Sequence, residues 1–184
     1  LPNMSVVAPA DAFQTRALLP QIIEADTPVY FRLLFPMMKN ITENFSSDYG
    51  KLQVLTEGND LTIFSYGQTL HSCLEVASEL DKLGVSCKVV NVHTIKPLET
   101  EALIDILEKT KKAVVVEEHN SYGGLGSIVS QIASEYCPTK IKFINTNDKF
   151  GLTGLPDEIL DHFGLSYNNI LKVCKDIINE KWKK

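Results

Sequence analysis

The sequence predicts an α/β protein with a three-layer α/β/α fold and an open, mostly parallel sheet, preceded by a short strand–helix–strand unit. Two observations support this prediction. From residue 51 onwards, short β-branched runs alternate with longer stretches of helical periodicity, which is the pattern of a layered parallel sheet. One of those runs, Ala113–Val116, is entirely apolar, as a strand covered on both faces requires.

Composition limits the class of protein. The chain has 184 residues, 44% of them hydrophobic, with a net charge of −5, which is typical of a globular chain with one domain or one domain and an appendage. A disordered, collagenous or coiled-coil chain is excluded. The mild acidity, without a basic stripe, argues against a nucleic-acid partner, and no apolar run is long enough to cross a membrane.

The first 35 residues indicate strand, helix and strand. Pro9 ends the short apolar run Ser5–Ala8, and Asp11 is a suitable N-cap for the helix that follows. Pro20 lies inside the helical pattern, so we expect a kink or a break there. The second strand is Val29–Phe31. A single unit of this kind leaves its sheet edges open, so it needs a partner.

Residues 36–50 are rich in Asn, Ser, Asp and Gly and have no sustained period, which indicates a linker. The regular part follows. We expect strands at 52–55, 61–66, 85–92, 113–116 and 141–144, and helices at 70–83, 98–107, 125–133, 156–163 and from 167 onwards. Gly84 is suited to the C-terminal cap of the first of these helices, and Pro156 to the first position of the fourth.

A glycine-rich turn is the first candidate site. Gly123, Gly124 and Gly126 follow a strand and open a helix, where free backbone amides and the helix dipole can hold an anion. The spacing is not that of a dinucleotide-binding motif. The alternative is a tight turn that needs glycine only for positive φ and close packing.

The second candidate is the run Glu117, Glu118 and His119 at the carboxyl end of the strand 113–116. Ligands bind at this edge of open α/β sheets, and a carboxylate beside an imidazole can perform acid–base chemistry. The alternative is structural. Successive strand residues point to opposite faces, so one glutamate would face solvent or a partner chain.

The other histidines and the cysteines carry weaker signals. His93, followed by Thr94 and Lys96, lies at a similar strand end, whereas His71 and His162 fall within helices and are expected to be surface or helix-face residues. No metal-ligand spacing is present, so no metal site is predicted. The cysteines suit buried small hydrophobes in a reducing compartment, with a disulfide as the alternative; they are Cys73, Cys87, Cys137 and Cys174.

Four segments together resemble the transketolase family. Three are similar to its C-terminal domain, and to the C-terminal subunit of split bacterial transketolases in particular: Val90–Leu103, Val114–Ser127 and Lys149–Leu165. The fourth, Met4–Leu33, looks like the end of the family's pyrimidine-binding domain. The resemblance therefore implies a remnant of that domain at 1–35, a linker at 36–50 and a transketolase C-terminal-like domain at 51–184.

This resemblance implies a cytoplasmic enzyme that uses thiamine diphosphate and Mg²⁺ to move a two-carbon ketol unit between sugars. The family's activating glutamate and its GDG motif belong to regions that this sequence does not contain. We therefore expect no catalytic, cofactor-binding or metal-binding residue in the chain. Its expected role is structural and dimerising, inactive alone, in a homodimeric enzyme completed by N-terminal domains or a separate N-terminal subunit.

One position departs from the family pattern. Relatives carry Arg-x-x-Arg after the second strand, and the resemblance assigns the second arginine to the substrate phosphate. Here Arg32 matches the first arginine, but Phe35 stands in place of the second. A phenyl ring cannot pair with a phosphate dianion. The expected substrate is therefore an unphosphorylated or otherwise modified sugar.

Two alternative functions stay open. Related β chains of 2-oxo acid dehydrogenases have a C-terminal domain that docks a partner enzyme, and the chain could be such an interaction module. The other alternative is a stand-alone regulatory domain that binds an anion through residues 123–126.

Overall fold

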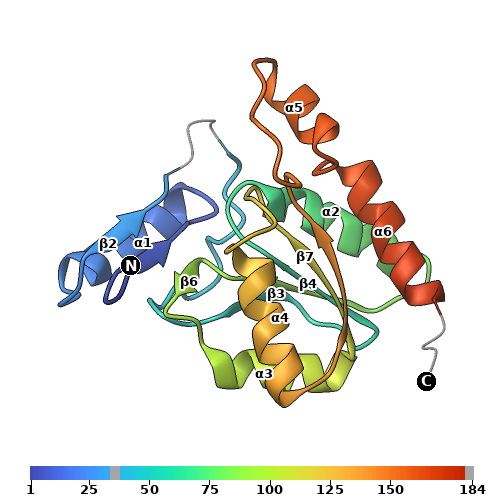
Figure 1. Cartoon of the computed structure of the whole chain (residues 1–184), viewed down its shortest axis with the longest axis horizontal. Helices are drawn as coiled ribbons and strands as arrows, with labels where there is room; N and C mark the ends of the chain where they lie inside the picture. Colours follow the sequence, from blue (N-terminus) through green and yellow to red (C-terminus); the bar gives the residue numbers. More distant parts are fainter. Residues whose placement is uncertain (34–37, 181–184) are drawn as a thin grey trace.

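The computed structural model describes residues 1–33 and 38–180, and Figure 1 shows how they are arranged. A five-stranded sheet forms the centre, in the order β3-β5-β4-β7-β8. β3 is antiparallel to β5, and the other neighbours are parallel. The strand bounds are Gln53–Thr56 (β3), Leu61–Ser65 (β4), Cys87–Asn91 (β5), Lys112–Val116 (β7) and Lys140–Ile144 (β8).

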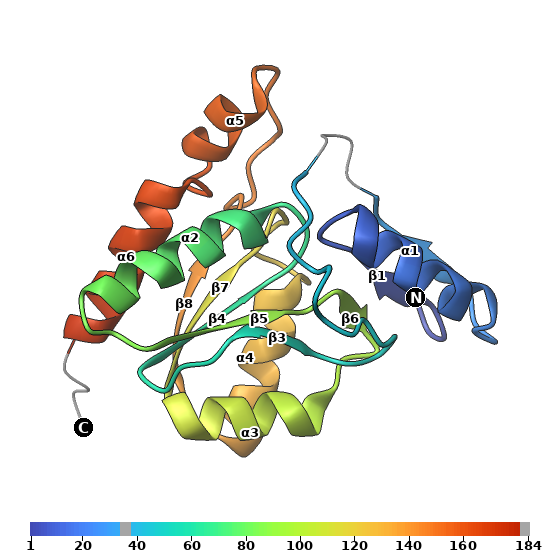
Figure 2. The same cartoon turned by 180° about the vertical axis from the view of Figure 1, so that it is seen from behind.

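Helices cover both faces of this sheet, which confirms the predicted three-layer α/β/α class. Figure 2 shows α2 and α6 on one side and α3 and α4 on the other. The helix bounds are Thr69–Lys82 (α2), Thr100–Thr110 (α3), Leu125–Tyr136 (α4), Pro156–His162 (α5) and Tyr167–Asn179 (α6). Gly84 lies two residues after the end of α2 and has a φ of +78°, as its expected role in the C-terminal cap requires.

The core consists of two apolar layers separated by the sheet. Successive residues of one strand pack in different layers, because their side chains point to opposite faces of the sheet. Ile63 of β4 packs in the layer under α2 and α6, whereas its neighbour Phe64 packs in the layer under α3 and α4. Both are fully buried. Burial on both faces explains why β7 contains the continuous apolar run Ala113–Val116, and why the apolar residues Ile63 and Phe64 are adjacent in β4.

The N-terminal residues form a second, smaller sheet in the order β2-β1-β6. β1 (Ser5–Val7) and β2 (Val29–Phe31) are parallel and are connected by α1 (Ala12–Ile23). The third strand, β6 (Thr94–Lys96), comes from the later part of the chain and pairs antiparallel with β1. The chain itself therefore covers the β1 edge of the N-terminal unit, while β2 is an edge strand of the small sheet.

The sequence analysis misses one strand of this region and expects a helix break that does not occur. The sequence does not predict β6, because a three-residue strand with one lysine has no measurable period. Helix α1 is also not broken at Pro20, which lies within its last turns. The helix ends only three residues later, at Ile23, so the proline removes one hydrogen bond of a turn that is already near the end.

Asp11 ties the N-terminal unit to the linker. It caps α1, because its carboxylate accepts from the backbone N–H of Gln14 at 2.9 Å. The same carboxylate accepts from the N–H groups of Ile41 and Thr42 and from the Thr42 hydroxyl, at 2.7 to 2.8 Å. Burial alone would raise the pKa of Asp11, but these donors outweigh it and hold the pKa below its ordinary value.

Candidate functional site

Arg32, which follows β2, reaches the carboxyl edge of the large sheet. Its Nη2 lies 3.1 Å from Glu118 Oε2, and its Nη1 donates to the Glu118 carbonyl oxygen at 3.2 Å. Gln68, just before α2, donates to the same carboxylate at 2.9 Å. Glu118 lies two residues after the end of β7. The site therefore joins residues that are 86 positions apart in the sequence.

Two cavities adjoin this ion pair. The larger, of about 580 Å³, has a polar end with Arg32, Gln68, Glu118, His119 and Lys149, and an apolar wall contributed mainly by the segment 151–165. The smaller, of about 470 Å³, lies between the small sheet and the glycine turn. Arg32, Glu118 and His119 line both cavities. Volumes of this size are typical of small-molecule sites.

Glu117 occupies the site that an external anion would need. Its side chain is buried, and its two carboxylate oxygens accept from the backbone N–H groups of Leu125 at 2.7 Å and Gly126 at 2.9 Å. These are the first amides of α4, where the helix dipole favours a negative charge. Within the expected anion site at Gly123, Gly124 and Gly126, the amides of Leu125 and Gly126 thus already bind the chain's own carboxylate.

The glycines of this turn are required for close packing. A Cβ at Gly124 would lie 2.3 Å from Glu117 Oε2, and a Cβ at Gly126 would lie 2.8 Å from the ring of Phe143 and 3.0 Å from Glu117 Oε1. Gly123 has a φ of +77°. The alternative interpretation, a turn that needs glycine for conformation and close approach, therefore agrees with the geometry.

The run Glu117, Glu118 and His119 does not assemble into an acid–base pair. Glu117 points into the turn and Glu118 toward Arg32, as alternation along the strand predicts. His119 is exposed, and its Nδ1 lies 3.1 Å from the Asn120 carbonyl oxygen. Among residues 1–33 and 38–180, no hydrogen bond joins its ring to either glutamate.

His93 lies in the interior and not at an accessible edge. It is fully buried, its Nδ1 is 3.0 Å from the Thr94 hydroxyl, and its Nε2 has no hydrogen-bond partner among the described residues. Burial lowers the pKa of His93 to about 4, so the ring is neutral at pH 7. His71 is half-buried, and burial lowers its pKa as well. His162 is exposed, as expected of a surface residue.

The cysteines are free and buried, as the sequence predicts, so the alternative of a disulfide is wrong. Burial raises the pKa of Cys73 and of Cys87 to about 12, which keeps both thiols protonated. Within the described part of the chain, the histidines, cysteines and acidic residues form no cluster suited to a metal ion. No described helix is long and apolar enough to span a membrane.

Fold and site together define a class of protein: an open three-layer α/β/α domain joined by a mixed sheet and an ion pair to an N-terminal strand–helix–strand unit. The family model "Transketolase, C-terminal domain" matches residues 50–170. The chain belongs to this family.

Individual relatives agree with this membership. The chain is 37% identical over 182 residues to the 6-deoxy-6-sulfo-D-fructose transketolase subunit SqwH of a Clostridium species, covering 98% of this chain and 56% of the relative. It is 33% identical to an apulose-4-phosphate transketolase subunit of Phocaeicola vulgatus, covering 97% and 58%. The beta chain of a pyruvate dehydrogenase E1 component from Staphylococcus epidermidis is 33% identical over 139 residues, covering 73% of this chain and 42% of that relative.

Among solved structures, one described as "Split gene transketolase, inactive beta4 tetramer" has a TM-score of 0.89 and 34% identity, covering 97% of this chain and 58% of that one. The chain thus spans a little more than half the length of the transketolase relatives that it matches.

Sequence reasoning misses the central feature of the site. Arg32 and Glu118 each stand out in the sequence, but nothing there pairs them. The signal that could pair them is their opposite charge at the carboxyl ends of two strands. Because β2 and β7 belong to different sheets, the sequence pattern does not place these two ends together. Phe35, the expected departure at the phosphate position, lies outside the described residues.

Proposed function

We propose that the chain is the C-terminal part of a cytoplasmic, thiamine diphosphate-dependent transketolase that transfers a two-carbon ketol unit between sugars. The observation that carries the proposal is the family match over residues 50–170 together with subunits of split transketolases that align over nearly the whole chain. The N-terminal remnant, linker and C-terminal-like domain are assigned to 1–35, 36–50 and 51–184.

The described residues do not fit the cofactor itself. A diphosphate–Mg²⁺ group needs clustered carboxylates or amides, but no metal-binding cluster occurs in residues 1–33 and 38–180, and the helix N-terminus at Gly124 already holds Glu117. We therefore derive no catalytic step from this chain. Its proposed role is to support and dimerise the enzyme, with the coenzyme bound by N-terminal domains or by a separate N-terminal subunit.

We also propose that the chain is inactive alone. The structural relative described as an inactive β4 tetramer, which matches 97% of this chain, supports this part of the proposal. The test is a coupled ketol-transfer assay with thiamine diphosphate and Mg²⁺, first with the chain alone and then with its N-terminal partner added. Turnover by the chain alone would refute the proposal, and so would failure of the reconstituted enzyme to transfer a ketol unit from any sugar of a broad panel.

The proposed donor is a sugar without a terminal phosphate, or with another group in its place. Phe35 occupies the position of the expected phosphate-binding arginine, and Arg32 is already engaged by Glu118. The relatives' names include both a sulfonated and a phosphorylated sugar, so the charged group on the sugar differs among these relatives. The test is steady-state kinetics of the complete enzyme, in which efficient turnover of xylulose 5-phosphate would refute this proposal.

The likeness to a pyruvate dehydrogenase β chain favours one second candidate, a domain that docks a partner enzyme in a 2-oxo acid dehydrogenase. Pyruvate oxidation by the reconstituted enzyme, with no ketol transfer between sugars, would favour this candidate over the first.

A further inference from the structure

The large sheet has a topological switch point between β4 and β7. From β4 the chain passes through α2 to β5 on one side, and it then crosses through α3 to β7 on the other side, with β8 beyond. The neighbouring pairs in this part of the sheet are parallel. At such a point the connections leave the strand ends in opposite directions, so a crevice opens outside the carboxyl ends, where ligands bind in open α/β sheets.

The larger of the two cavities, of about 580 Å³, lies at this crevice. Gln68 follows β4 by three residues and Glu118 follows β7 by two, and both line the cavity. Figures 1 and 2 show the loop after β8 and helix α5 rising beyond the same end of the sheet. These segments contribute the outer wall. The cavity is therefore bounded by the ends of several strands and not by a single loop.

The polar end of the cavity contains a lysine whose charge is not balanced. Arg32 and Glu118 neutralise each other, with 3.1 Å between Nη2 and Oε2. Lys149 also lines the cavity, and within the described part of the chain it forms no salt bridge. The adjacent Asp148 is not a lining residue, and its carboxylate accepts from the side chain of Asn120. An entering group with a single negative charge would balance the lysine.

The outer wall of the cavity is apolar. It is contributed by Leu152, Pro156, Ile159, Leu160 and Phe163. α5 contains no buried residue, and Leu152 is 52% exposed, so the described part of the chain leaves this wall accessible. Contact with an apolar body would remove the wall from water. An apolar wall opposite an unbalanced cation fits a monoanion with an apolar body, and neither a bare inorganic anion nor a sugar uses both features.

We propose that this cavity binds a small carboxylic acid with a compact apolar body. The carboxylate pairs with the Lys149 ammonium, and the body lies against the side chains of Leu152 and Phe163. A carboxylate carries the single charge that one lysine balances, whereas a phosphate dianion would leave a second negative charge beside Glu118. Because its ligand is apolar, this site differs from a site for the sugars of the proposed ketol transfer and is additional to it.

The test uses 4-phenylbutyrate as the probe, titrated into the chain by isothermal calorimetry. We expect one molecule to bind per chain with a Kd of about 1 mM or below, as a ligand of about a dozen heavy atoms can attain. The neutral 4-phenylbutanamide is expected to bind at least about tenfold more weakly, because it cannot form an ion pair with Lys149. Inorganic phosphate is expected to bind at least about tenfold more weakly as well, because it has no apolar body.

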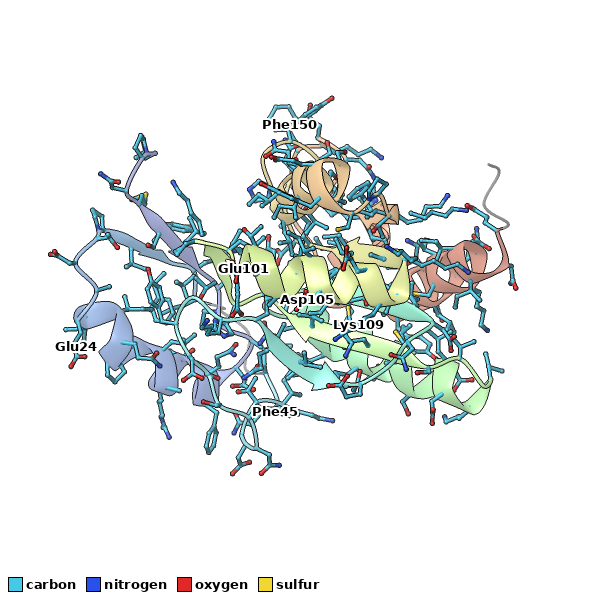
Figure 3. The ribbon with its side chains drawn as sticks, turned by 90° about the horizontal axis from the view of Figure 1, so that it is seen from below. Glu24, Phe45, Glu101, Asp105, Lys109 and Phe150 are labelled. Atoms are coloured by element: carbon cyan, nitrogen blue, oxygen red, sulfur yellow. The ribbon has the colours of Figure 1, made fainter. Side chains whose placement is uncertain are left out.

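Two variants with matched controls locate the binding. Lys149→Ala is expected to weaken it at least about tenfold. The control is Lys109→Ala, since Lys109 is exposed at the end of α3, before the amino end of β7. Figure 3 shows it well separated from Phe150, the neighbour of Lys149. Leu152→Ser is expected to weaken binding about threefold to tenfold, and its control is Leu83→Ser, 54% exposed just after α2. Circular dichroism verifies that each variant is folded.

Several results would overturn the proposal. One is the absence of binding at about 10 mM 4-phenylbutyrate, well above the expected Kd. Another is equal affinity for the acid and for the amide or phosphate, because charge and apolar body would then not act together. Equal effects of Lys149→Ala and Lys109→Ala would show that the acid binds elsewhere. Ketol transfer takes no part in these measurements, so their failure would leave the proposed function standing.

Discussion

Replacing Glu117 by glutamine tests whether its carboxylate is a structural cap for α4. The substitution keeps the size of the side chain but removes its charge and turns one acceptor into a donor. In the structure both carboxylate oxygens accept backbone hydrogen bonds, at 2.7 and 2.9 Å, and the residue is 1% exposed. In Glu117→Gln, one of the two amides of α4 therefore meets an N–H group and loses its acceptor.

The magnitude follows from these contacts. A hydrogen bond to a charged group contributes about 1.5–3 kcal/mol, and a charge at a partly buried helix terminus contributes up to about 2 kcal/mol. The variant avoids the cost of burying a charge, which offsets part of the loss. We expect the free energy of unfolding of Glu117→Gln to fall by about 2–4 kcal/mol.

Urea denaturation at pH 7, followed by circular dichroism, measures this change. The neighbouring Glu118→Gln is the control, since Glu118 is partly exposed and is expected to lose no more than about 1 kcal/mol. A second variant, Gly124→Ala, tests the same contact, because its Cβ would collide with the Glu117 carboxylate. Its cost should shrink in a Glu117→Ala background, because the collision is then absent. A Glu117→Gln chain as stable as wild type would refute the assigned capping role.

Three further predictions concern the junction of the two sheets. A double-mutant cycle on Arg32 and Glu118 is expected to give a coupling free energy of roughly 0.5–1 kcal/mol, because both side chains are about one-third exposed and screened by solvent. Asp11→Ala is expected to lower the free energy of unfolding by about 3–5 kcal/mol at pH 7, since three backbone N–H groups lose their acceptor. The loss should diminish as the pH falls through the lowered pKa of Asp11 in the folded state, where the wild type also loses this stabilisation. For His93, whose folded pKa is about 4, stability should fall as the pH drops from about 6.5 to 4, by about 3 kcal/mol, because only the unfolded state binds the proton over that range.

Each of these outcomes has a control. His93→Gln removes the titrating ring, so its stability should lack the extra dependence on pH between 6.5 and 4. Equal pH dependence of wild type and His93→Gln would contradict a buried neutral histidine. For the ion pair, coupling should weaken with added salt, and a coupling energy insensitive to salt would contradict a solvent-screened pair. For Asp11, a cost that did not change below pH 4 would contradict its lowered pKa.

Most of the large domain could be predicted from the sequence, because its elements are long enough to show a period and are bounded by Gly, Pro and capping residues. The run Ala113–Val116 is apolar on both faces, which indicates a strand of a covered parallel sheet. β6 could not be found in this way. It has three residues, and its hydrogen-bond partner β1 lies almost ninety residues earlier in the chain.

The site is harder to predict than the fold, because it consists of contacts between distant segments. Glu117 and the glycine turn are each recognisable in the sequence, but as two separate candidates. A carboxylate before a helix and free amides at its first turn are complementary, and the short connection between them brings them together. Local patterns identify both groups, but only the folded geometry shows that they satisfy each other.

The pairing of β6 with β1 means that covalent order and spatial order differ in this chain. The small sheet takes two strands from the residues before the linker and one from well after it. The hydrogen bond from Asn91 to the Gln14 side chain and the Arg32 ion pair cross the same boundary. Cleavage by a protease between residues 43 and 46 should therefore leave two peptides that remain associated through β-ladder hydrogen bonds, and that separate only under denaturing conditions.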